Sequence, residues 1–314
     1  MNWQKLIGLA AFFLVPLMFS GRLSSATISE QPNGSEVITV LGNRGEQAGI
    51  AGSQAKAITL RPAIDTPLSR HYQPICLRLF GIDPAYGEPI ADRIRNNIRW
   101  LGLPVGKENC QPNVWIGFFS NSKAEVERLR KREPAMFASL APHEFKRIFA
   151  GSGAVQVWHA TETRSLDGRP IPVVRVQIGD SLSGRDIETG YNAQYRAGRL
   201  VSPIRNDING TIVVFDRGRA NGLTIQQLAD YATFRILAPV QDFAQVEPNA
   251  LPSILQLFTP GAMPPDGLTE FDWAYLAAYY KLDRGAGASA VHDATRRAML
   301  DGTGQKLREK AAAD

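Results

Sequence analysis

The chain has 314 residues, enough for one large domain or two small ones, with the apolar and charged fractions of an ordinary soluble protein. Its formal net charge is +5, and the basic residues are scattered among acidic ones rather than gathered in a stripe with interleaved aromatic residues. This distribution argues against a nucleic acid as the partner.

The N-terminus carries a targeting signal. Lys5 supplies a positive start, an apolar run covers 6–19, and residues 24–26 are small enough for signal peptidase. We therefore expect 1–26 to be a cleaved secretory signal peptide and the protein to be periplasmic or secreted. The apolar run is short for a membrane span, which needs about 20 residues, and an anchor formed by the uncleaved segment is the alternative.

Residues 27–66 are expected to form a flexible leader behind the signal peptide. The segment contains five glycines and many polar residues. A short strand at 36–41 that pairs with a partner's edge is the alternative. A mobile leader is favoured because segments next to a terminus are commonly poorly ordered.

The chain contains two cysteines, Cys76 and Cys110. In an exported domain, two cysteines most simply form a disulfide. A catalytic cysteine is the alternative, but it needs a base, and no histidine lies next to either residue in the sequence. We therefore favour a structural bridge.

Periodicity predicts the elements of the first half of the folded part. A helix over 87–101 follows from apolar residues at helical spacing, namely Ile90, Ile94, Ile98 and Leu101. A buried strand is predicted at 114–119, a charged helix at 122–132 and a short helix at 142–149.

Two strands, at 154–163 and 171–178, are predicted to pair as a hairpin because the residues between them have turn composition. His159, within the first strand, is expected to contact a neighbouring element. The polar stretch 179–199 is expected to be a long loop, either functional or an insertion.

Asn209 and Gly210 form a strong turn signal between predicted strands at 200–204 and 211–215. The second of these strands is strongly apolar, so we expect it to be buried.

The best-defined helix follows at 224–237. Thr224 and Gln227 have the spacing of a capping box, and Pro239 ends the segment. Because apolar residues occupy most of its surface, we expect this helix to be buried on more than one side.

A second helix is predicted to begin after Thr269. Leu268 precedes the cap and Trp273 occupies the staple position. Glu270 and Asp272 place negative charge in the first turn, where the helix dipole favours it.

These elements resemble the core of metzincin-type zinc peptidases. In that family a strand leads to an active-site helix with His-Glu-x-x-His, a Ser-Ile-Met turn follows, and a later helix opens with Leu-Thr-x-x-Asp and ends near Leu-Tyr. Here the turn corresponds to Ser253-Ile254-Leu255, and the later helix opens with Leu268-Thr269-Glu270-Phe271-Asp272 and reaches Ala278-Tyr279-Tyr280.

The resemblance covers about 211–281 and extends to uncharacterised secreted proteobacterial proteins, including a domain-of-unknown-function family with a degenerate version of the pattern. It implies an α+β fold in which a zincin-like mixed sheet packs on a central buried helix, behind the signal peptide. We expect this domain to span 67–282, with a separate N-terminal module to about 150 as an alternative, followed by a partly helical tail at 283–314.

The chain departs from the metzincin pattern at the zinc ligands. Catalytic zinc needs three protein ligands, two of which are histidines four residues apart on the helix. Residues 211–281 contain no histidine, and no two histidines of the chain are four apart: they are His71, His143, His159 and His292. If Asp230 took the first ligand position, Phe234 would take the second, and if Gln227 did, Tyr231 would.

We therefore expect no metal and no cofactor, and a fold retained after catalysis was lost. Leu255 stands where the family has methionine, which conserves volume. The candidate groove residues are Asp216, Arg217, Gln227, Asp230 and Tyr231. Structural roles are expected for Cys76, Cys110, Thr224, Ser253, Leu255, Thr269 and Asp272.

The preferred hypothesis is a non-enzymatic zincin-like domain that binds a peptide or protein partner in the cell envelope. A groove bordered by an edge strand would suit strand addition. The first alternative is a hydrolase that uses Asp216, Asp230 and a histidine from a loop. The second is a structural envelope protein held by its leader and its C-terminal tail.

Overall fold

The computed structural model describes residues 35–60, 67–150, 153–171, 173–176, 187–191, 203–241 and 250–313. The predicted signal peptide, 1–26, lies outside these residues. None of the described helices combines the length and the apolarity that crossing a membrane requires.

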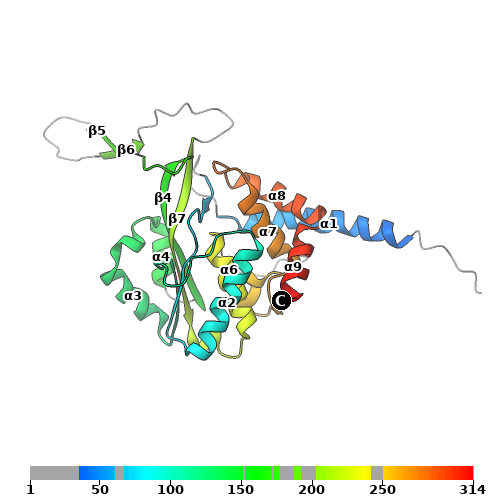
Figure 1. The fold of residues 1–314 in the computed structure, drawn as a ribbon, viewed down its shortest axis with the longest axis horizontal. Coiled ribbons are helices and arrows are strands. Elements are labelled where there is room, and N and C mark those ends of the chain that lie inside the picture. The colour runs from blue at the N-terminus through cyan, green and yellow to red at the C-terminus, as the bar shows by residue number, and fades with distance from the viewer. Residues whose placement is uncertain are drawn as a thin grey trace, which may run out of the picture.

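A mixed sheet forms the centre of the molecule (Figure 1). β2 (Leu77–Phe80), β3 (Val114–Phe119) and β7 (Ile204–Asp216) run parallel, and the short β1 (Ser69–Arg70) pairs in parallel with the start of β7. β4 (Val155–Ser165) runs antiparallel along the other side of β7. β4 is therefore the end strand of the sheet on that side.

Helices cover both faces of this sheet (Figure 1). α2 (Pro84–Trp100), α6 (Ile225–Leu237) and α7 (Glu270–Lys281) pack with Val213 and Phe215 into the larger core. The opposite face carries the smaller core around Trp158, which is covered by α3, η1 and α4. These three elements span Ser122–Arg132, Pro134–Phe137 and Pro142–Ala150.

The mixed α/β architecture agrees with the expected α+β class. The predicted helices at 87–101, 122–132 and 142–149 correspond to α2, α3 and α4, and the predicted strand at 114–119 is β3. The face of α2 that was predicted from periodicity is buried: the exposed fractions of Ile90, Ile94 and Ile98 do not exceed 1 %.

The structure differs from the predicted hairpin of 154–163 and 171–178. β4 pairs with β7, whereas β5 (Val173–Val176) pairs with β6 (Ile187–Tyr191) in a separate two-stranded sheet. The turn itself is present, because the Ser165 amide donates to the Arg169 carbonyl at 3.1 Å. The long apolar β7 offers β4 a full ladder, which the shorter segment after the turn does not.

Only part of the predicted loop at 179–199 is described. Residues 187–191 form β6 rather than loop, and the remaining positions of this stretch lie outside the described residues.

Asn209 and Gly210 do not form the predicted turn, because both lie within the continuous strand β7. The pairing with β4 passes from Gly210 directly to Ile208, so Asn209 is an extra residue that makes a bulge. A Cβ atom at Gly210 would lie 3.2 Å from the ring of Trp115. Glycine is needed there for close packing rather than for reversing the chain.

The expected flexible leader at 27–66 differs from the structure over Ser35–Ile58, which form the helix α1. Ala48, Ala51 and Ala55 are fully buried and face α8 (Ser289–Leu300). Among the described side chains of α1, the buried positions facing α8 are mainly alanines, with Gly52 and Gln54 beside them and Ile58 as the one large apolar residue, so the repeated large apolar residues that reveal an amphipathic helix are few.

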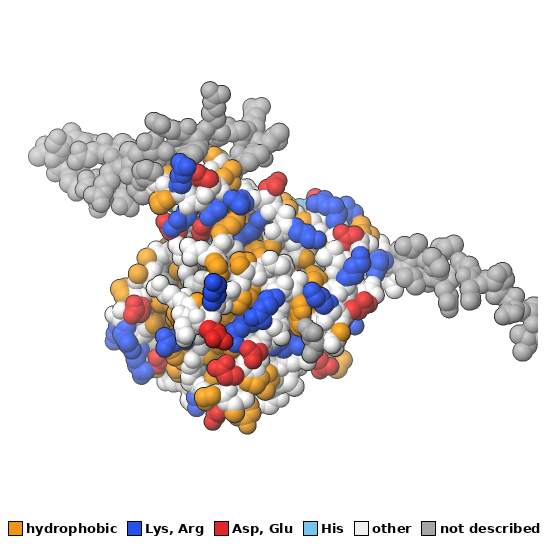
Figure 2. Space-filling model, viewed as in Figure 1, with side chains coloured by type: hydrophobic (Ala, Val, Ile, Leu, Met, Phe, Trp, Pro, Cys, Tyr) orange, Lys and Arg blue, Asp and Glu red, His pale blue; other side chains and the backbone are white. Residues whose placement is uncertain are grey.

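The C-terminal tail is helical and packed. α8 places Val291 and Met299 in the core, and α9 (Thr303–Ala313) lies against α7. On the face seen in Figure 2, Lys and Arg side chains are interspersed with Asp and Glu, so no basic stripe is visible there.

The predicted disulfide is confirmed: Cys76 is bonded to Cys110. The bridge fastens the residue before β2 to the connection that leads into β3. The Cys76 amide donates to the Asn113 side chain at 2.8 Å, which helps to fix the same connection.

Candidate binding groove

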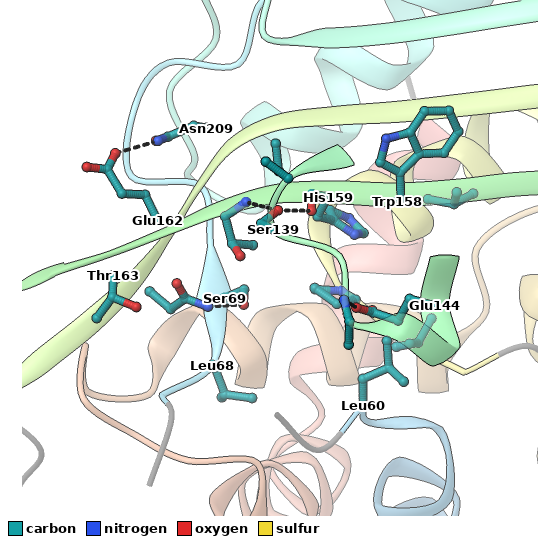
Figure 3. A pocket seen from close by; sticks show the side chains of 18 of the residues that line it. Leu60, Leu68, Ser69, Ser139, Glu144, Trp158, His159, Glu162, Thr163 and Asn209 are labelled. Carbon is teal, nitrogen blue, oxygen red and sulfur yellow. Dashed lines mark hydrogen bonds between the residues drawn. The ribbon is translucent and has the colours of Figure 1, made fainter. Parts of the chain in front are cut away.

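A cavity of about 1090 Å³ opens beside β4 (Figure 3). The strand contributes residues from Val157 to Thr163, and Asn206 of β7 lies next to them. Ser139, Glu144 and Arg147 line a second side, from the η1–α4 connection and from α4. A third side is largely apolar and comprises Leu60, Leu68, Pro239 and Val240.

The outer edge of β4 borders this cavity. The Ala154 carbonyl accepts a bond from the Asp216 amide at 2.8 Å, so the main-chain groups of even-numbered residues point toward β7. Because successive residues of a strand alternate, the main-chain groups of Val157, His159 and Thr161 point away from β7.

Within the described residues, the strand pairing of β4 is with β7, apart from an isolated bridge between Arg164 and Pro170. The stretch from Val157 to Thr161 therefore has no strand on its outer side. An unpaired edge of this kind is a template for an additional strand.

Side chains bond three consecutive carbonyls at the end of α6. His159 Nε2 contacts the Arg235 carbonyl at 3.0 Å, His71 Nε2 contacts the Ile236 carbonyl at 3.2 Å, and Tyr280 donates to the Leu237 carbonyl at 2.9 Å. The last carbonyls of a helix lack partners within it, so these groups complete its C-terminus. His159 thus contacts a neighbouring element, as predicted.

Burial keeps both of these histidines uncharged near neutral pH. It lowers the pKa of His71 to about 4, against a small opposing effect of the bond to Ile236. It lowers the pKa of His159 to about 3, with further lowering by the nearby His71 and Arg235. Neutral imidazoles that donate to carbonyls serve the packing of α6 on the sheet and leave no proton for acid catalysis.

Tyr231 and Arg235 are the pair of α6 residues, four apart, at the groove. Arg235 lines the cavity, and its Nη1 donates to the Tyr231 hydroxyl at 3.0 Å. Neither ligand register considered from the sequence places this pair together. Tyr231 itself is buried against Phe258, with the two rings edge to face at 5.0 Å.

These residues do not fit a catalytic zinc ion. A guanidinium is a permanent cation without a lone pair to donate, so Arg235, which lines the cavity, cannot ligate a zinc ion. In the described part of the chain, no group of three or more His, Cys, Asp or Glu side chains could hold a metal ion.

Asp230 lies in the larger core, where its partners come from α2 and the start of α7. Arg93 donates to its two oxygens at 2.7 and 2.9 Å, Asn97 donates at 2.7 Å, and the Leu268 amide donates at 2.9 Å. Its carboxylate is fully buried and is balanced by this set. A Cβ atom at Gly267 would come within 2.4 Å of it, which explains the glycine there.

Asp216 and Arg217 fasten the end of β7. Asp216 caps the short helix α5 (Arg217–Ala220) by accepting from the Arg219 amide at 3.1 Å. Arg217 donates to the Gly81 carbonyl at 2.6 Å and to the Phe118 carbonyl at 3.2 Å. Their partners are main-chain groups of neighbouring elements.

Gln227 completes the predicted capping box of α6 with Thr224 and also donates to the Pro265 carbonyl at 3.1 Å. Of the five candidate groove residues, Tyr231 is therefore the one that contacts a side chain lining the cavity. Asp216, Arg217, Gln227 and Asp230 hold structural contacts.

Asp272 joins the turn and the helix that carry the metzincin resemblance. It accepts bonds from Ser253 Oγ at 2.6 Å, from the Ile254 amide at 2.8 Å, and from the amide and hydroxyl of Thr269 at 2.9 and 3.0 Å. Burial raises the pKa of Asp272 to about 6, and the donated bonds act against that rise. Leu255 is buried beside this junction, in η2 (Ile254–Phe258).

Little in the sequence indicated the groove residues themselves. Ser139 lies in an unremarkable stretch, and a threonine such as Thr161 marks a strand without showing which of its edges is open. Arg235 follows an apolar helical run, where a positive charge near the C-terminus is ordinary. The one available signal was the four-residue spacing of Tyr231 and Arg235.

Comparisons of the chain with protein-family models, with curated proteins and with solved structures found no match. A functional proposal for this chain therefore rests on the groove beside β4 and on the chemistry of its walls.

Proposed function

We propose that this protein is an exported, non-catalytic zincin-like domain that binds an extended peptide segment along the outer edge of β4. One observation carries the proposal: a cavity of about 1090 Å³ lies beside a strand edge that, in the described part of the chain, has no strand on its outer side between Val157 and Thr161. An extended chain placed there gains main-chain hydrogen bonds from the edge and apolar contacts from the opposite wall.

The composition of the walls supports a peptide rather than a small charged metabolite. Leu60, Leu68 and Val240 offer apolar surface, while Glu144 and Arg147 on another side carry opposite charges. A strand presents alternate side chains to opposite sides. A segment with apolar residues at every second position would match this division.

The zincin-like assignment rests on the order of elements and on the junction at Asp272. β7 leads through α5 to the buried α6, and Asp272 of α7 bonds the turn at Ser253 and Ile254. This contact explains why the Ser253-Ile254-Leu255 turn and the helix start with Asp272 occur together in the chain. It supports descent from a peptidase frame whose groove follows an edge strand.

The non-catalytic part of the proposal rests on Arg235 and Tyr231. Arg235 lines the cavity with a cation that cannot ligate zinc, and this cation is bonded to the hydroxyl of the buried Tyr231. Export is supported by the disulfide between Cys76 and Cys110, since such bonds persist in oxidising compartments such as the periplasm.

The hydrolase alternative gains no support from the contacts. Asp216 caps α5 and Asp230 pairs with Arg93, while His159 bonds the Arg235 carbonyl. These groups have separate partners and do not converge on one reacting position. The structural-envelope alternative has no specific contact in its favour.

The test is binding of an array of peptides of about eight residues, with apolar residues at alternate positions, to the purified protein. Binding is measured by fluorescence anisotropy, and the tightest peptide is then resynthesised with N-methyl groups at alternate positions. We expect methyl groups in one phase to weaken binding by at least about ten-fold, because they remove several main-chain bonds. Methyl groups shifted by one residue serve as the matched control and should be tolerated.

Two variants place the binding at this edge. Thr161→Pro removes an outward amide without removing a bond to β7 and should weaken binding, whereas Thr161→Val keeps the amide and should not. Equal sensitivity to both methylation phases, or full binding by a folded Thr161→Pro protein, would contradict strand addition at β4.

A further inference from the structure

The side chain of Ser139 bonds the outer edge of β4 (Figure 3). Its hydroxyl donates to the His159 carbonyl at 3.4 Å and accepts from the Thr161 amide at 3.1 Å. These are the two outward main-chain groups on either side of Ala160. One exposed hydroxyl therefore makes both contacts that a residue of an added parallel strand would make there.

The residues before Ser139 are anchored to the strand. Trp158 donates through its indole N–H to the Met136 carbonyl at 3.2 Å, and the rings of Phe137 and Trp158 are stacked at 4.9 Å. Ala138 and Ser139 themselves are exposed. Met136 and Phe137 are thus held against β4, while Ala138 and Ser139, which follow them, lie outside the core.

We infer that Ser139 holds the place of the ligand's main chain and that a bound peptide displaces it from His159 and Thr161. The inference rests on the proposed function. It identifies Ala160 as the position where a bound peptide competes with the Ser139 hydroxyl for the main chain of β4. The bond from the hydroxyl to the His159 carbonyl, at 3.4 Å, is long for its type, whereas main-chain bonds in a sheet lie near 2.9 Å. An incoming strand replaces the two bonds of the hydroxyl with two main-chain bonds.

The exchange also restricts the ligand. The added strand that makes this exchange runs parallel to β4, so its residue opposite Ala160 donates its amide to the His159 carbonyl and accepts from the Thr161 amide. Proline and N-methylated residues are therefore excluded at that one position. The cost of displacing Ser139 lowers affinity for any segment too short to pair on both sides of Ala160, so the groove selects extended chains over isolated side chains.

The test compares Ser139→Ala with wild type in two measurements. Amide hydrogen exchange of Thr161 in the protein alone should be faster in Ser139→Ala, because its acceptor is gone. Anisotropy with the tightest peptide of the alternating array should show about five-fold tighter binding, the effect of removing one ordinary competing hydrogen bond. Ser139→Thr keeps a hydroxyl and should resemble wild type.

Ser53→Ala is the matched control, since Ser53 is an exposed serine whose hydroxyl bonds the Gly49 carbonyl within α1. Unchanged Thr161 exchange in Ser139→Ala overturns the inference. So does equal or weaker peptide binding by this variant while wild type still shows the phase-dependent effect of N-methylation, and in that case the proposed function stands. Absence of peptide binding by both proteins overturns the inference together with the proposed function.

Discussion

At the residue scale, the junction between the turn at Ser253 and the start of α7 depends on Asp272. Its carboxylate accepts four bonds from donors on the turn before η2 and at the start of α7. An amide of the same shape has one acceptor oxygen and turns an N–H₂ toward donors that it cannot satisfy. The junction therefore requires an acid rather than merely a polar residue.

We expect Asp272→Asn to lower the free energy of unfolding by about 2–4 kcal/mol, because buried donors lose their acceptor. Urea unfolding at pH 8, where the carboxylate is ionised, measures the change. Asp266→Asn is the control, since Asp266 is exposed and should change stability by less than about 0.5 kcal/mol. Equal stability of the two variants would show that the four bonds do not hold the junction.

His71 makes folding dependent on pH. Its pKa is about 4 in the folded protein, against 6.5 for an unperturbed histidine, so below 6.5 the unfolded chain binds the proton that the folded chain refuses. The stability that His71 contributes is therefore full above pH 6.5 and is lost as the pH falls toward 4. The slope is about 1.4 kcal/mol per pH unit.

The pH effect is best measured as a difference between variants. The pKa of Asp272 is raised to about 6, so its contribution is lost as the pH rises through 6 and opposes that of His71 between pH 4 and 6. His159, whose pKa is lowered to about 3, adds a contribution of the same sign as His71. We expect His71→Gln to lower the slope of stability against pH by about 1.4 kcal/mol per pH unit between pH 6.5 and 4, while His143→Gln, at an exposed position of α4, leaves the slope unchanged. Identical slopes in both variants would count against a neutral buried His71.

At the scale of elements, α1 is the part of the fold that the sequence concealed. Its described buried residues include three alanines and only one large apolar residue, Ile58, and its glycines suggested a loose segment. Gly45 and Gly49 have open space where a Cβ atom would lie, whereas a Cβ atom at Gly52 would lie 3.4 Å from the His292 carbonyl oxygen. These positions are therefore occupied by glycine for different reasons.

We expect Gly49→Ala to raise the free energy of unfolding by about 0.5–1 kcal/mol, because alanine in a helix interior loses less backbone entropy on folding. Gly52→Ala should gain less, since its methyl group must fit against α8. Thermal unfolding of the two variants measures the difference. A loss of stability in Gly49→Ala would mean that this segment is not helical in solution.

The elements that could be predicted were those whose signals are local. The caps at Thr224 and Thr269 are both present as capping boxes, and the isoleucine stripe of α2 faces the core. The predictions that were wrong concerned which strand pairs with which. Asn209 and Gly210 have turn composition, but only the presence of β4 beside β7 makes them a bulge.

The same limit applied to the candidate groove. Asp230 stood out as a polar residue on an apolar helix, but the sequence could not show that Arg93 and Asn97 reach it from α2. Ser139 and Thr161 lie 22 residues apart, and nothing local to either predicts that the two are bonded. Edges and cavities arise from the packing of distant segments, so they are accessible from structure alone.

At the scale of the whole molecule, the two hydrophobic cores have different structural roles. The larger core, with α1, α2 and α6 to α9, holds the frame, and the smaller core around Trp158 positions the segment that carries Ser139. The groove lies where β4 passes between them, with Leu60 and Val240 on one side and α4 on another. A peptide bound there would contact both parts of the molecule.

The most direct measurement of the central claim is residue-resolved amide hydrogen exchange across β4, with and without the tightest peptide of the alternating array. Strand addition predicts new protection at the outward amides of His159 and Thr161, and no change at the inward amides of Trp158 and Ala160, which already face β7. Protection that ignores this alternation, or that appears away from β4 altogether, would contradict a peptide paired along this edge.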